Sequence, residues 1–225
     1  MNEFKSVVKT VKNRFETVLF DFDGTLADTA PGITYCALEA LHAYGFDETD
    51  PQRLREFIGP PLVDSFLRYT DDECTAKAMV DKYREHYRAG GMFRCELYGG
   101  VAEMLSALDA AGIRMAIASS KPGEFVDTIL NHLGIREYFG FISAPAVGHV
   151  NPTKCELINA ALDALGADRA TTAMVGDRLF DIEGAKQADV FAVGVLYGFG
   201  SMEEFSRYGA DAVCETPQQI SELIL

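Results

Sequence analysis

Short apolar runs alternate along the chain with longer segments that mix apolar and polar residues. Four runs have the length and composition of buried strands: Val18–Phe22, Ile113–Ser119, Thr172–Val175 and Val190–Leu196. Amphipathic segments of helical length lie between and beside them: Val101–Ala111, Glu124–Leu133, Cys155–Leu165 and Ile182–Ala188. Strands that alternate with helices pair in parallel through right-handed crossovers. The pattern therefore predicts an α/β fold with a doubly wound parallel sheet.

The alternation stops between about Pro31 and Tyr98, where helical patterns follow one another and no strand is expected. One helix carries Ile33, Ala37 and Leu41 on the same face, and proline or aspartate start signals precede three further helices. We therefore expect an all-helical domain over residues 31–98, inserted into a core domain formed by residues 1–30 and 99–225. Residues 1–16 are expected to be an N-terminal extension to which the sequence assigns no role.

The composition is that of an ordinary globular protein, with 48% hydrophobic and 24% charged residues. A net charge of −14 without a basic cluster argues against nucleic acid or an anionic membrane as a partner. No apolar run approaches the roughly 18 residues of a membrane span, and Met1–Arg14 lacks the apolar core of a signal peptide. We expect a cytoplasmic protein, a monomer or weak dimer, whose five scattered cysteines stay reduced.

Polar side chains follow three of the predicted strands at their carboxyl ends, where ligands bind in open α/β sheets. They form three pairs: Asp21 with Asp23, Ser119 with Ser120, and Asp177 with Asp181. Carboxylates that lie close together repel one another unless a cation lies between them, and Mg²⁺ is usually held by one or two carboxylates with waters and a substrate phosphate. The sequence therefore predicts a Mg²⁺ site, beside a turn at Gly24 whose amides can point at phosphate oxygens.

Three segments, in this order and spacing, resemble motifs of the haloacid dehalogenase superfamily in its phosphatase and mutase branch. They are Asp21-Phe22-Asp23-Gly24-Thr25-Leu26 with Asp28-Thr29, Ala118-Ser119-Ser120-Lys121-Pro122, and Val175-Gly176-Asp177 with Asp181-Ile182 and Gly184-Ala185. In the helical insert, Ile58-Gly59-Pro60-Pro61-Leu62 resembles the phosphoglycolate-phosphatase-like group. The likeness covers the chain from Thr17 onward and identifies the insert, residues 31–98, with a helical cap domain.

The resemblance implies a Mg²⁺-dependent reaction through a phospho-aspartate. Asp21 would attack phosphorus, and Asp23 would protonate the leaving group and then activate water. The metal ligands would be the carboxylates of Asp21 and Asp177 and the main-chain carbonyl of Asp23. Asp181 would lie behind them and steady the lysine or a metal-bound water. The phosphate would be bound by Gly24, Thr25, Ser119, Ser120 and Lys121.

The chain departs from the family at the third motif, which usually reads Lys-Pro-x-Pro. Here the matching stretch is Asn151-Pro152-Thr153-Lys154, so an alignment on Pro152 places Asn151 where the lysine usually stands. A site without a lysine would leave transition-state charge under-compensated. The catalytic ammonium is therefore that of Lys154, in the first turn of the next helix, or that of Lys121. We favour Lys154.

These features predict a Mg²⁺-dependent phosphatase that acts on small phosphorylated metabolites, with the helical insert as a lid. Phosphoglycolate is the best-known substrate of the group that the chain resembles, and nucleotidase, pyrophosphatase and phosphomutase activities of the β-phosphoglucomutase type remain alternatives. A catalytically inactive binding module on the same fold would be expected to lack Asp21 or Asp177. Dehalogenase chemistry is disfavoured because that branch lacks the second aspartate, which is present here as Asp23.

Overall fold

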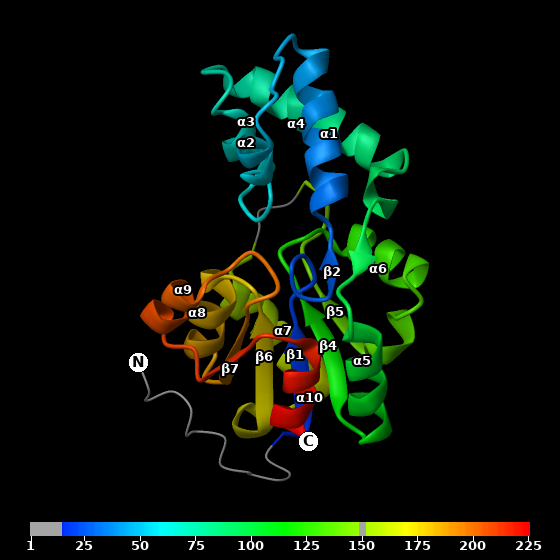
Figure 1. The fold of residues 1–225 in the computed structure, drawn as a ribbon, viewed down its shortest axis with the longest axis vertical. Helices are drawn as coiled ribbons and strands as arrows, with labels where there is room; N and C mark the ends of the chain where they lie inside the picture. Colours follow the sequence, from blue (N-terminus) through cyan, green and yellow to red (C-terminus); the bar gives the residue numbers. More distant parts are fainter. Residues whose placement is uncertain (1–14, 149–151) are drawn as a thin grey trace. The chain divides into compact units, whose positions relative to one another are not determined.

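The computed structural model describes residues 15–148 and 152–225, which divide into two compact units. The first unit is formed by the described residues up to Leu26 and by Leu97–Leu225, and the second by Ala27–Glu96 (Figure 1). The extension expected at residues 1–16 lies outside the described residues, except for Phe15 and Glu16. Within the described ranges, no helix is long and apolar enough to cross a membrane.

A parallel sheet of six strands forms the centre of the first unit, in the order β5-β4-β1-β6-β7-β8. The strands are β1 (Thr17–Phe20), β4 (Arg114–Ala118), β5 (Phe141–Ser143), β6 (Thr172–Gly176), β7 (Phe191–Val195) and β8 (Ala212–Cys214). In β1, Leu19 lies opposite Ala116 of β4 and Met174 of β6. All four residues of β1 are buried, as in a strand that is covered on both faces. The predicted parallel α/β fold is confirmed.

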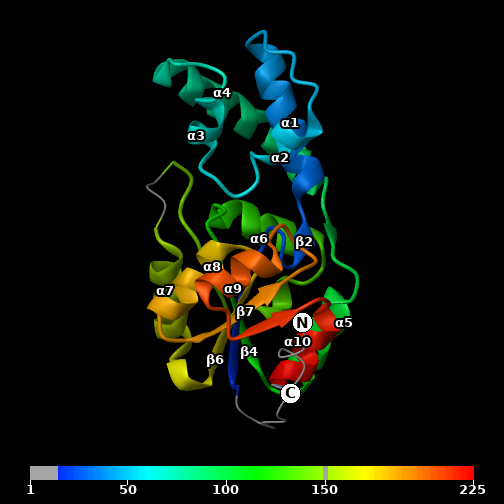
Figure 2. The ribbon, with the colours of Figure 1, turned by 60° about the vertical axis from the view of Figure 1, so that its left-hand side comes forward.

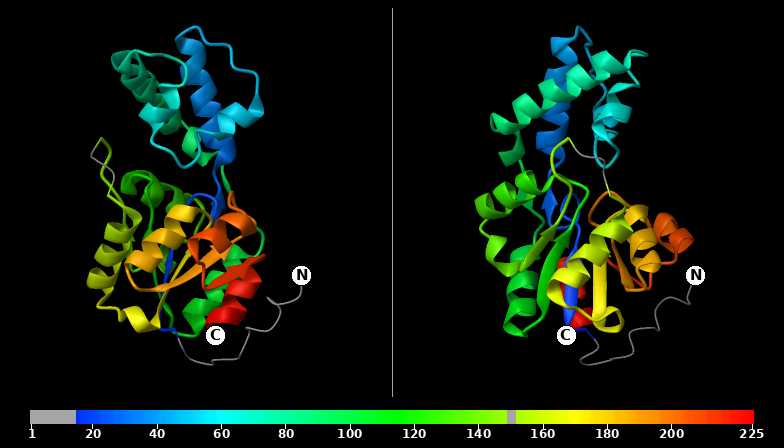
Figure 3. Two further views of the ribbon diagram at one scale, coloured as in Figure 1. Left: turned by 90° about the vertical axis from the view of Figure 1, so that its left-hand side faces the viewer. Right: turned by 180° about the vertical axis from the view of Figure 1, so that it is seen from behind.

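Helices cover both faces of this sheet (Figure 2). One layer contains α5 (Val101–Ala110), α6 (Gly123–His132) and α10 (Pro217–Ile224). The other contains α7 (Lys154–Leu165), α8 (Leu179–Gln187) and α9 (Met202–Tyr208). Figure 3 shows the same layering from two further sides. On the α7 and α8 face, Leu19 of β1 packs in one buried cluster with Ile158 and Ile182, so the strand that carries the first motif is fixed by core packing.

The sequence pattern found the inner strands of the sheet and missed its edges. β1, β4, β6 and β7 correspond to the four predicted runs, whereas β5 and β8 were not predicted. Each of these two strands has three residues, too few to show a periodic pattern. Each is an outermost strand that pairs with one neighbour, β4 or β7. Tertiary pairing, rather than local sequence, therefore defines the edges.

The second unit is built from helices. They are α1 (Ala30–Ala43), α2 (Pro51–Arg55), α3 (Leu62–Phe66), α4 (Glu73–Arg88) and a 3₁₀ turn over Gly91–Phe93. Asp72 caps α4 by accepting hydrogen bonds from the amides of Cys74 and Thr75. The backbone approaches itself closely near α1, because a Cβ at Gly32 would lie 2.4 Å from the carbonyl oxygen of Gly91.

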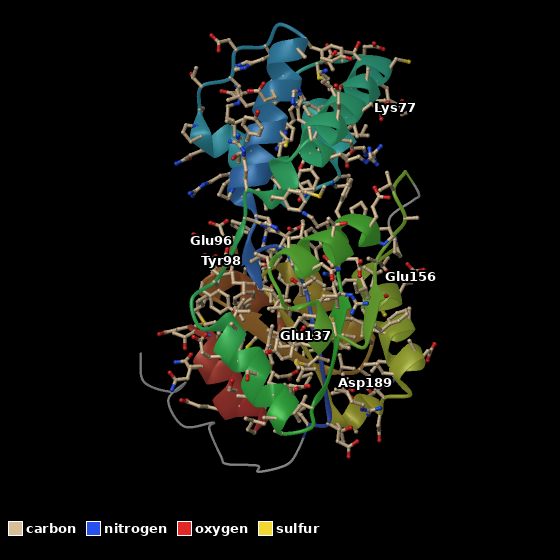
Figure 4. The ribbon with its side chains drawn as sticks, turned by 90° about the vertical axis from the view of Figure 1, so that its right-hand side faces the viewer. Lys77, Glu96, Tyr98, Glu137, Glu156 and Asp189 are labelled. Atoms are coloured by element: carbon tan, nitrogen blue, oxygen red, sulfur yellow. The ribbon has the colours of Figure 1, made fainter. Side chains whose placement is uncertain are left out.

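The chain enters and leaves the second unit through two short strands that pair with each other, β2 (Ala27–Asp28) and β3 (Glu96–Leu97). The sequence pattern predicted no strand within residues 31–98, and β3 corrects that expectation, since two residues cannot show an alternating pattern. Beside the pair, the amide of Tyr98 donates to the carbonyl of Leu26 over 3.2 Å. Glu96 and Tyr98 are labelled in Figure 4. The two crossings of the chain are therefore held side by side.

The contact between Gly194 of β7 and Phe205 of α9 makes a prediction about packing. A Cβ at Gly194 would lie 2.7 Å from two atoms of the fully buried Phe205 ring. We expect Gly194→Ala to lower the free energy of unfolding by about 1–3 kcal/mol, because a closed core has no room for another methyl group. Denaturant unfolding followed by circular dichroism measures the change. Adding Phe205→Leu should recover part of the loss, and strictly additive effects would contradict the contact.

Candidate active site

Three neighbouring strands bring the predicted site residues to one edge of the sheet. Asp21 follows β1, Ser119 follows β4 and Asp177 follows β6. These three residues lie side by side because β1 pairs in parallel with both β4 and β6. The amide of Asp21 also donates to the carbonyl of Val175 over 2.9 Å, so main-chain pairing reaches the site itself. This edge is where an open parallel sheet binds ligands.

The chain turns sharply after β1 around the main-chain carbonyl of Phe22. That carbonyl accepts hydrogen bonds from the amides of Thr25 (3.3 Å) and Leu26 (3.0 Å). Gly24 has a φ of +78°, and a Cβ there would lie 2.2 Å from Oδ2 of Asp177. Glycine is therefore required both by the backbone conformation and by the close approach of the turn to Asp177.

Asp21, Asp177 and Asp181 form a cluster in which one carboxylate oxygen of each lies within 4.8 Å of the other two. Asp177 and Asp181 are 1% exposed. Burial raises the pKa of Asp21 to about 6, helped by the Asp181 carboxylate and opposed by the Lys154 ammonium. Burial and the carboxylates of Asp181 and Asp21 raise the pKa of Asp177 to about 8. The cluster therefore holds more negative charge than its surroundings stabilise.

The donor set of this cluster fits a hard divalent cation. Among the described residues, Oδ1 of Asp21 and Oδ1 of Asp181 are buried and accept no hydrogen bond. Lys154 lies within ion-pairing distance of both atoms, without the alignment of a hydrogen bond. A cation held by oxygen ligands would satisfy these atoms and reduce the repulsion among the carboxylates. The carboxylate of Asp23 is not part of the cluster, and the ligand expected from this residue is its main-chain carbonyl.

Lys154 is presented to the cluster by the first turn of α7. The start of this helix is fixed by a capping box, in which Thr153 Oγ1 accepts from the amide of Glu156 (3.2 Å) and the Glu156 carboxylate accepts from the amide of Thr153 (2.7 Å). Figure 4 labels Glu156 in this turn. A Cβ at Gly184 of α8 would lie 2.7 Å from Cβ of Lys154, so the lysine stem passes close to that helix.

The ammonium of Lys154 lies among acceptors at the carboxyl ends of the strands. Its Nζ lies 3.1 Å from Oδ1 of Asp21 and 2.8 Å from Oδ1 of Asp181, and it donates to the carbonyl of Ala118 over 2.9 Å. Burial works against the charged form, but the carboxylates of Asp181 and Asp21 outweigh it and raise the pKa of Lys154 above its ordinary value. Lys154 therefore remains a cation beside Asp21.

Lys121 contacts Asp23, the other aspartate of the first motif. Its Nζ donates to Oδ1 and Oδ2 of Asp23 over 2.9 and 3.1 Å. The structure thus brings both candidate lysines to the carboxyl edge of the sheet and gives each a different aspartate. Asn151, which occupies the usual lysine position in the sequence, lies outside the described residues.

The remaining expected phosphate-binding residues differ in their surroundings. Ser119 is buried and its hydroxyl accepts from the amide of Lys121 over 3.4 Å, whereas Ser120 is exposed. The hydroxyl of Thr25 is buried and donates to Oδ1 of Asp177 over 3.4 Å, and its amide is bonded within the turn. Thr25 therefore contacts Asp177, and we do not assign it the phosphate contact that the sequence analysis expected.

The loop after β7, residues 197–200, reaches the same place and was not identified from the sequence. The amide of Phe199 donates to Oδ2 of Asp177 over 2.9 Å. The hydroxyl of Tyr197 donates to the carbonyl of Thr25 over 3.0 Å. The available signal was the glycine-flanked stretch Gly198-Phe199-Gly200 directly after a buried strand.

Comparisons with known proteins agree with this site. The family model described as haloacid dehalogenase-like hydrolase matches residues 18–195. A 5'-nucleotidase of Pseudomonas aeruginosa is 38% identical over 89% of this chain and 91% of its own length. The pyrophosphatase PpaX of Halalkalibacterium halodurans is 34% identical over 92% of this chain and 96% of its own length. A structure described as a predicted phosphatase from Clostridium acetobutylicum is 36% identical, with a TM-score of 0.85, and covers 93% of this chain and 98% of that one.

The chain therefore belongs to the haloacid dehalogenase-like hydrolases, as its three motifs indicated. Within that family it is an enzyme of the phosphoric monoester hydrolase class, because the relatives that match most of its length include phosphatases and a 5'-nucleotidase. The predicted family and enzyme class are confirmed.

The raised pKa values of Asp21 and Asp177 predict that cation binding depends on pH. A divalent cation binds ionised carboxylates, so its affinity should rise as the pH increases from about 6 to about 8, with release of protons. In the cation-free protein, the folded state holds these protons more tightly than the unfolded chain does. Its melting temperature should therefore fall over the same range, and added cation should restore it most at high pH.

Calorimetric titration with MgCl₂ in buffers of different ionisation enthalpy measures the protons released. In the cation-free protein, Asp177→Asn should remove the part of the pH dependence of the melting temperature near pH 8. An affinity that stays constant between about pH 6 and about pH 8 would contradict the titration of these carboxylates.

Proposed function

We propose that this protein is a Mg²⁺-dependent phosphatase that hydrolyses small phosphate monoesters through a phospho-aspartate on Asp21. The observation that carries the proposal is the position of Asp21 at the carboxyl end of a central strand, 3.1 Å from the Lys154 ammonium and clustered with Asp177 and Asp181. A carboxylate in that place has a cationic neighbour and a set of oxygen ligands suited to a metal. An anionic nucleophile requires such positive charge nearby, because it must approach an anionic phosphate.

The first half of the proposed reaction transfers the phosphoryl group to Asp21. A carboxylate oxygen of Asp21 forms a bond to phosphorus, and the bond from phosphorus to the ester oxygen breaks. Asp23 gives its proton to the departing alkoxide, which leaves as an alcohol. Bound Mg²⁺, held by the cluster and the Asp23 carbonyl, would reduce the charge repulsion between nucleophile and substrate.

The second half removes the phosphoryl group as inorganic phosphate. Asp23, now a carboxylate, takes a proton from water while the water oxygen bonds to phosphorus and the acyl phosphate bond breaks. Lys154 stays beside Asp21 and stabilises the charge that develops there. In this proposal the phosphate oxygens are bound by Ser119, Ser120, Lys121 and the turn at Gly24.

The identities of the relatives support a ranking of substrates. Phosphoglycolate was the first expectation from sequence, and a Vibrio parahaemolyticus phosphoglycolate phosphatase is 29% identical to this chain. The 5'-nucleotidase is closer, at 38% identity over most of both chains. Ranked by these identities, nucleoside 5'-monophosphates come first, pyrophosphate second because PpaX is 34% identical, and phosphoglycolate third. A phosphomutase would convert one sugar phosphate into its isomer without net release of phosphate.

The mechanism is tested by measuring phosphate release from nucleoside 5'-monophosphates, phosphoglycolate, pyrophosphate and sugar phosphates, with and without Mg²⁺. We expect release that requires Mg²⁺ and that Asp21→Asn lowers by the order of 10⁴-fold or more, because the nucleophile is lost. Asp109→Asn, at an exposed position of α5, is the matched control and should keep full activity. An active Asp21→Asn enzyme, or no release from any substrate, would refute the proposal.

The two lysines should differ in effect because they contact different aspartates. We expect Lys154→Met to lower kcat by about 10²–10³-fold, since the charge developing at Asp21 loses its ammonium. Lys121→Met should act more on KM, because it removes a phosphate-binding cation and its hydrogen bonds to Asp23. Steady-state kinetics on both variants, with thermal melting to check folding, measures the difference. If Lys121→Met had the larger effect on kcat, the roles assigned to the two lysines would be reversed.

A further inference from the structure

The loop after β7, residues 197–200, contacts Asp177 and the turn after β1 at the same time. We propose that this loop is a positioning element that fixes the orientation of the Asp177 carboxylate for cation binding. The proposal rests on the proposed function, in which Asp177 is a metal ligand. It adds residues that belong to none of the three motifs and that touch neither the nucleophile nor the lysines in any contact described above.

Both oxygens of Asp177 accept hydrogen bonds, and the two donors lie in the segments that follow β7 and β1. Oδ2 accepts from the amide of Phe199 over 2.9 Å, and Oδ1 accepts from the hydroxyl of Thr25 over 3.4 Å. Asp177 is 1% exposed, so water cannot replace these donors freely. A main-chain amide in a fixed loop gives the carboxylate one preferred orientation. Such outer partners of metal ligands tune the affinity of a site for its ion.

The loop also holds the turn after β1 from its outer side. The hydroxyl of Tyr197 donates to the carbonyl of Thr25 over 3.0 Å, and its ring packs against Tyr98 with a centroid distance of 5.1 Å. Burial raises the pKa of Tyr197, so the hydroxyl keeps the proton that it donates. Since Thr25 in turn contacts Asp177, Tyr197 acts on the carboxylate through the turn.

Glycine is needed at two positions of this loop because neighbouring atoms leave no room for a Cβ. Gly198 does not have a positive φ, so an alanine could adopt its backbone conformation. A Cβ at Gly198 would nevertheless lie 2.2 Å from the carbonyl oxygen of Gly24 and 2.5 Å from Cβ of Asp177. A Cβ at Gly200 would lie 2.1 Å from the carbonyl oxygen of Asp177. The absent side chains therefore allow the loop to approach the metal-ligand candidate and the β1 turn.

Gly198→Ala tests the proposal, because the three atoms nearest to its added Cβ are the carbonyl oxygen of Gly24 and Cβ and Oδ2 of Asp177, all under 3 Å away. We expect the dissociation constant for Mg²⁺, measured by calorimetric titration without substrate, to rise by about 10–100-fold. Gly99→Ala is the control, because a Cβ at Gly99 would meet no atom within 4 Å. It should bind Mg²⁺ like the parent protein.

Tyr197→Phe keeps the ring and removes the hydroxyl, so it tests the positioning role of the loop if Gly198→Ala does not fold. We expect it to raise the Mg²⁺ dissociation constant by about 10-fold, the lower end of that range. A merely structural loop would lower the melting temperature in both variants and leave the dissociation constant within about twofold of the parent value, and that result would overturn the proposal.

Asp177→Asn separates the failure of this proposal from the failure of the cation site. If Asp177→Asn binds Mg²⁺ as tightly as the parent protein, the cation lies elsewhere, and the proposed function and the loop proposal both fail. If Asp177→Asn loses binding while Gly198→Ala and Tyr197→Phe retain it, only the loop proposal fails. Loss of binding in Asp177→Asn together with weaker binding in Gly198→Ala and Tyr197→Phe supports both.

Discussion

The site depends on burying three carboxylates around a single ammonium. Two like charges a few ångströms apart repel by roughly 4 kcal/mol at an effective dielectric constant of 20, and the cluster contains three carboxylate pairs whose nearest oxygens lie within 4.8 Å of each other. Lys154 offsets part of this repulsion through Asp21 and Asp181. With all four groups ionised, the excess of two negative charges equals the charge of one divalent cation. Burial, together with the repulsion from the neighbouring carboxylates, raises the pKa values of Asp21 and Asp177, so protons can also neutralise the cluster.

Each member of this charge cluster comes from a different element. Asp21 follows β1, Asp177 follows β6, Asp181 lies in the first turn of α8, and Lys154 begins α7. The distances of Asp21 and Lys154 to the other members are therefore set by the sheet register and by helix packing, whereas Asp177 and Asp181 are four residues apart in one local stretch of chain. This explains how relatives named a 5'-nucleotidase and a pyrophosphatase can match the chain over most of its length. The sheet and its packed helices fix the residues that would bind and transfer a phosphoryl group. Residues elsewhere on the protein can differ among relatives and so suit different substrates.

Sequence reasoning located the ends of the inner strands because each is marked twice, by an apolar run and by the polar residue that ends it. Asp21, Ser119 and Asp177 could be assigned to one edge of a sheet in this way from the sequence alone. The same reasoning could not separate the lysines, because the pairing of Lys121 with Asp23 and of Lys154 with Asp21 depends on side-chain reach across strands. It also missed the loop of residues 197–200, since its contacts to Asp177 and Thr25 join positions far apart in the chain and are made largely by main-chain atoms.

The pairing of β2 with β3 has a consequence for the order in which the chain folds. β1 must pair with β4, and Thr17 lies opposite Arg114, so the core cannot close until the whole insert has been synthesised. When the second unit is folded, the pairing of β2 with β3 brings together the core segments that precede and follow the insert. The chain between β1 and β4 then behaves as a short loop instead of a long one. The entropy of closing the core falls accordingly, by roughly 1–2 kcal/mol. The insert interrupts the sheet in sequence, yet its folding can assist the assembly of the sheet. The insert is synthesised after β1, and it is able to fold before the core does.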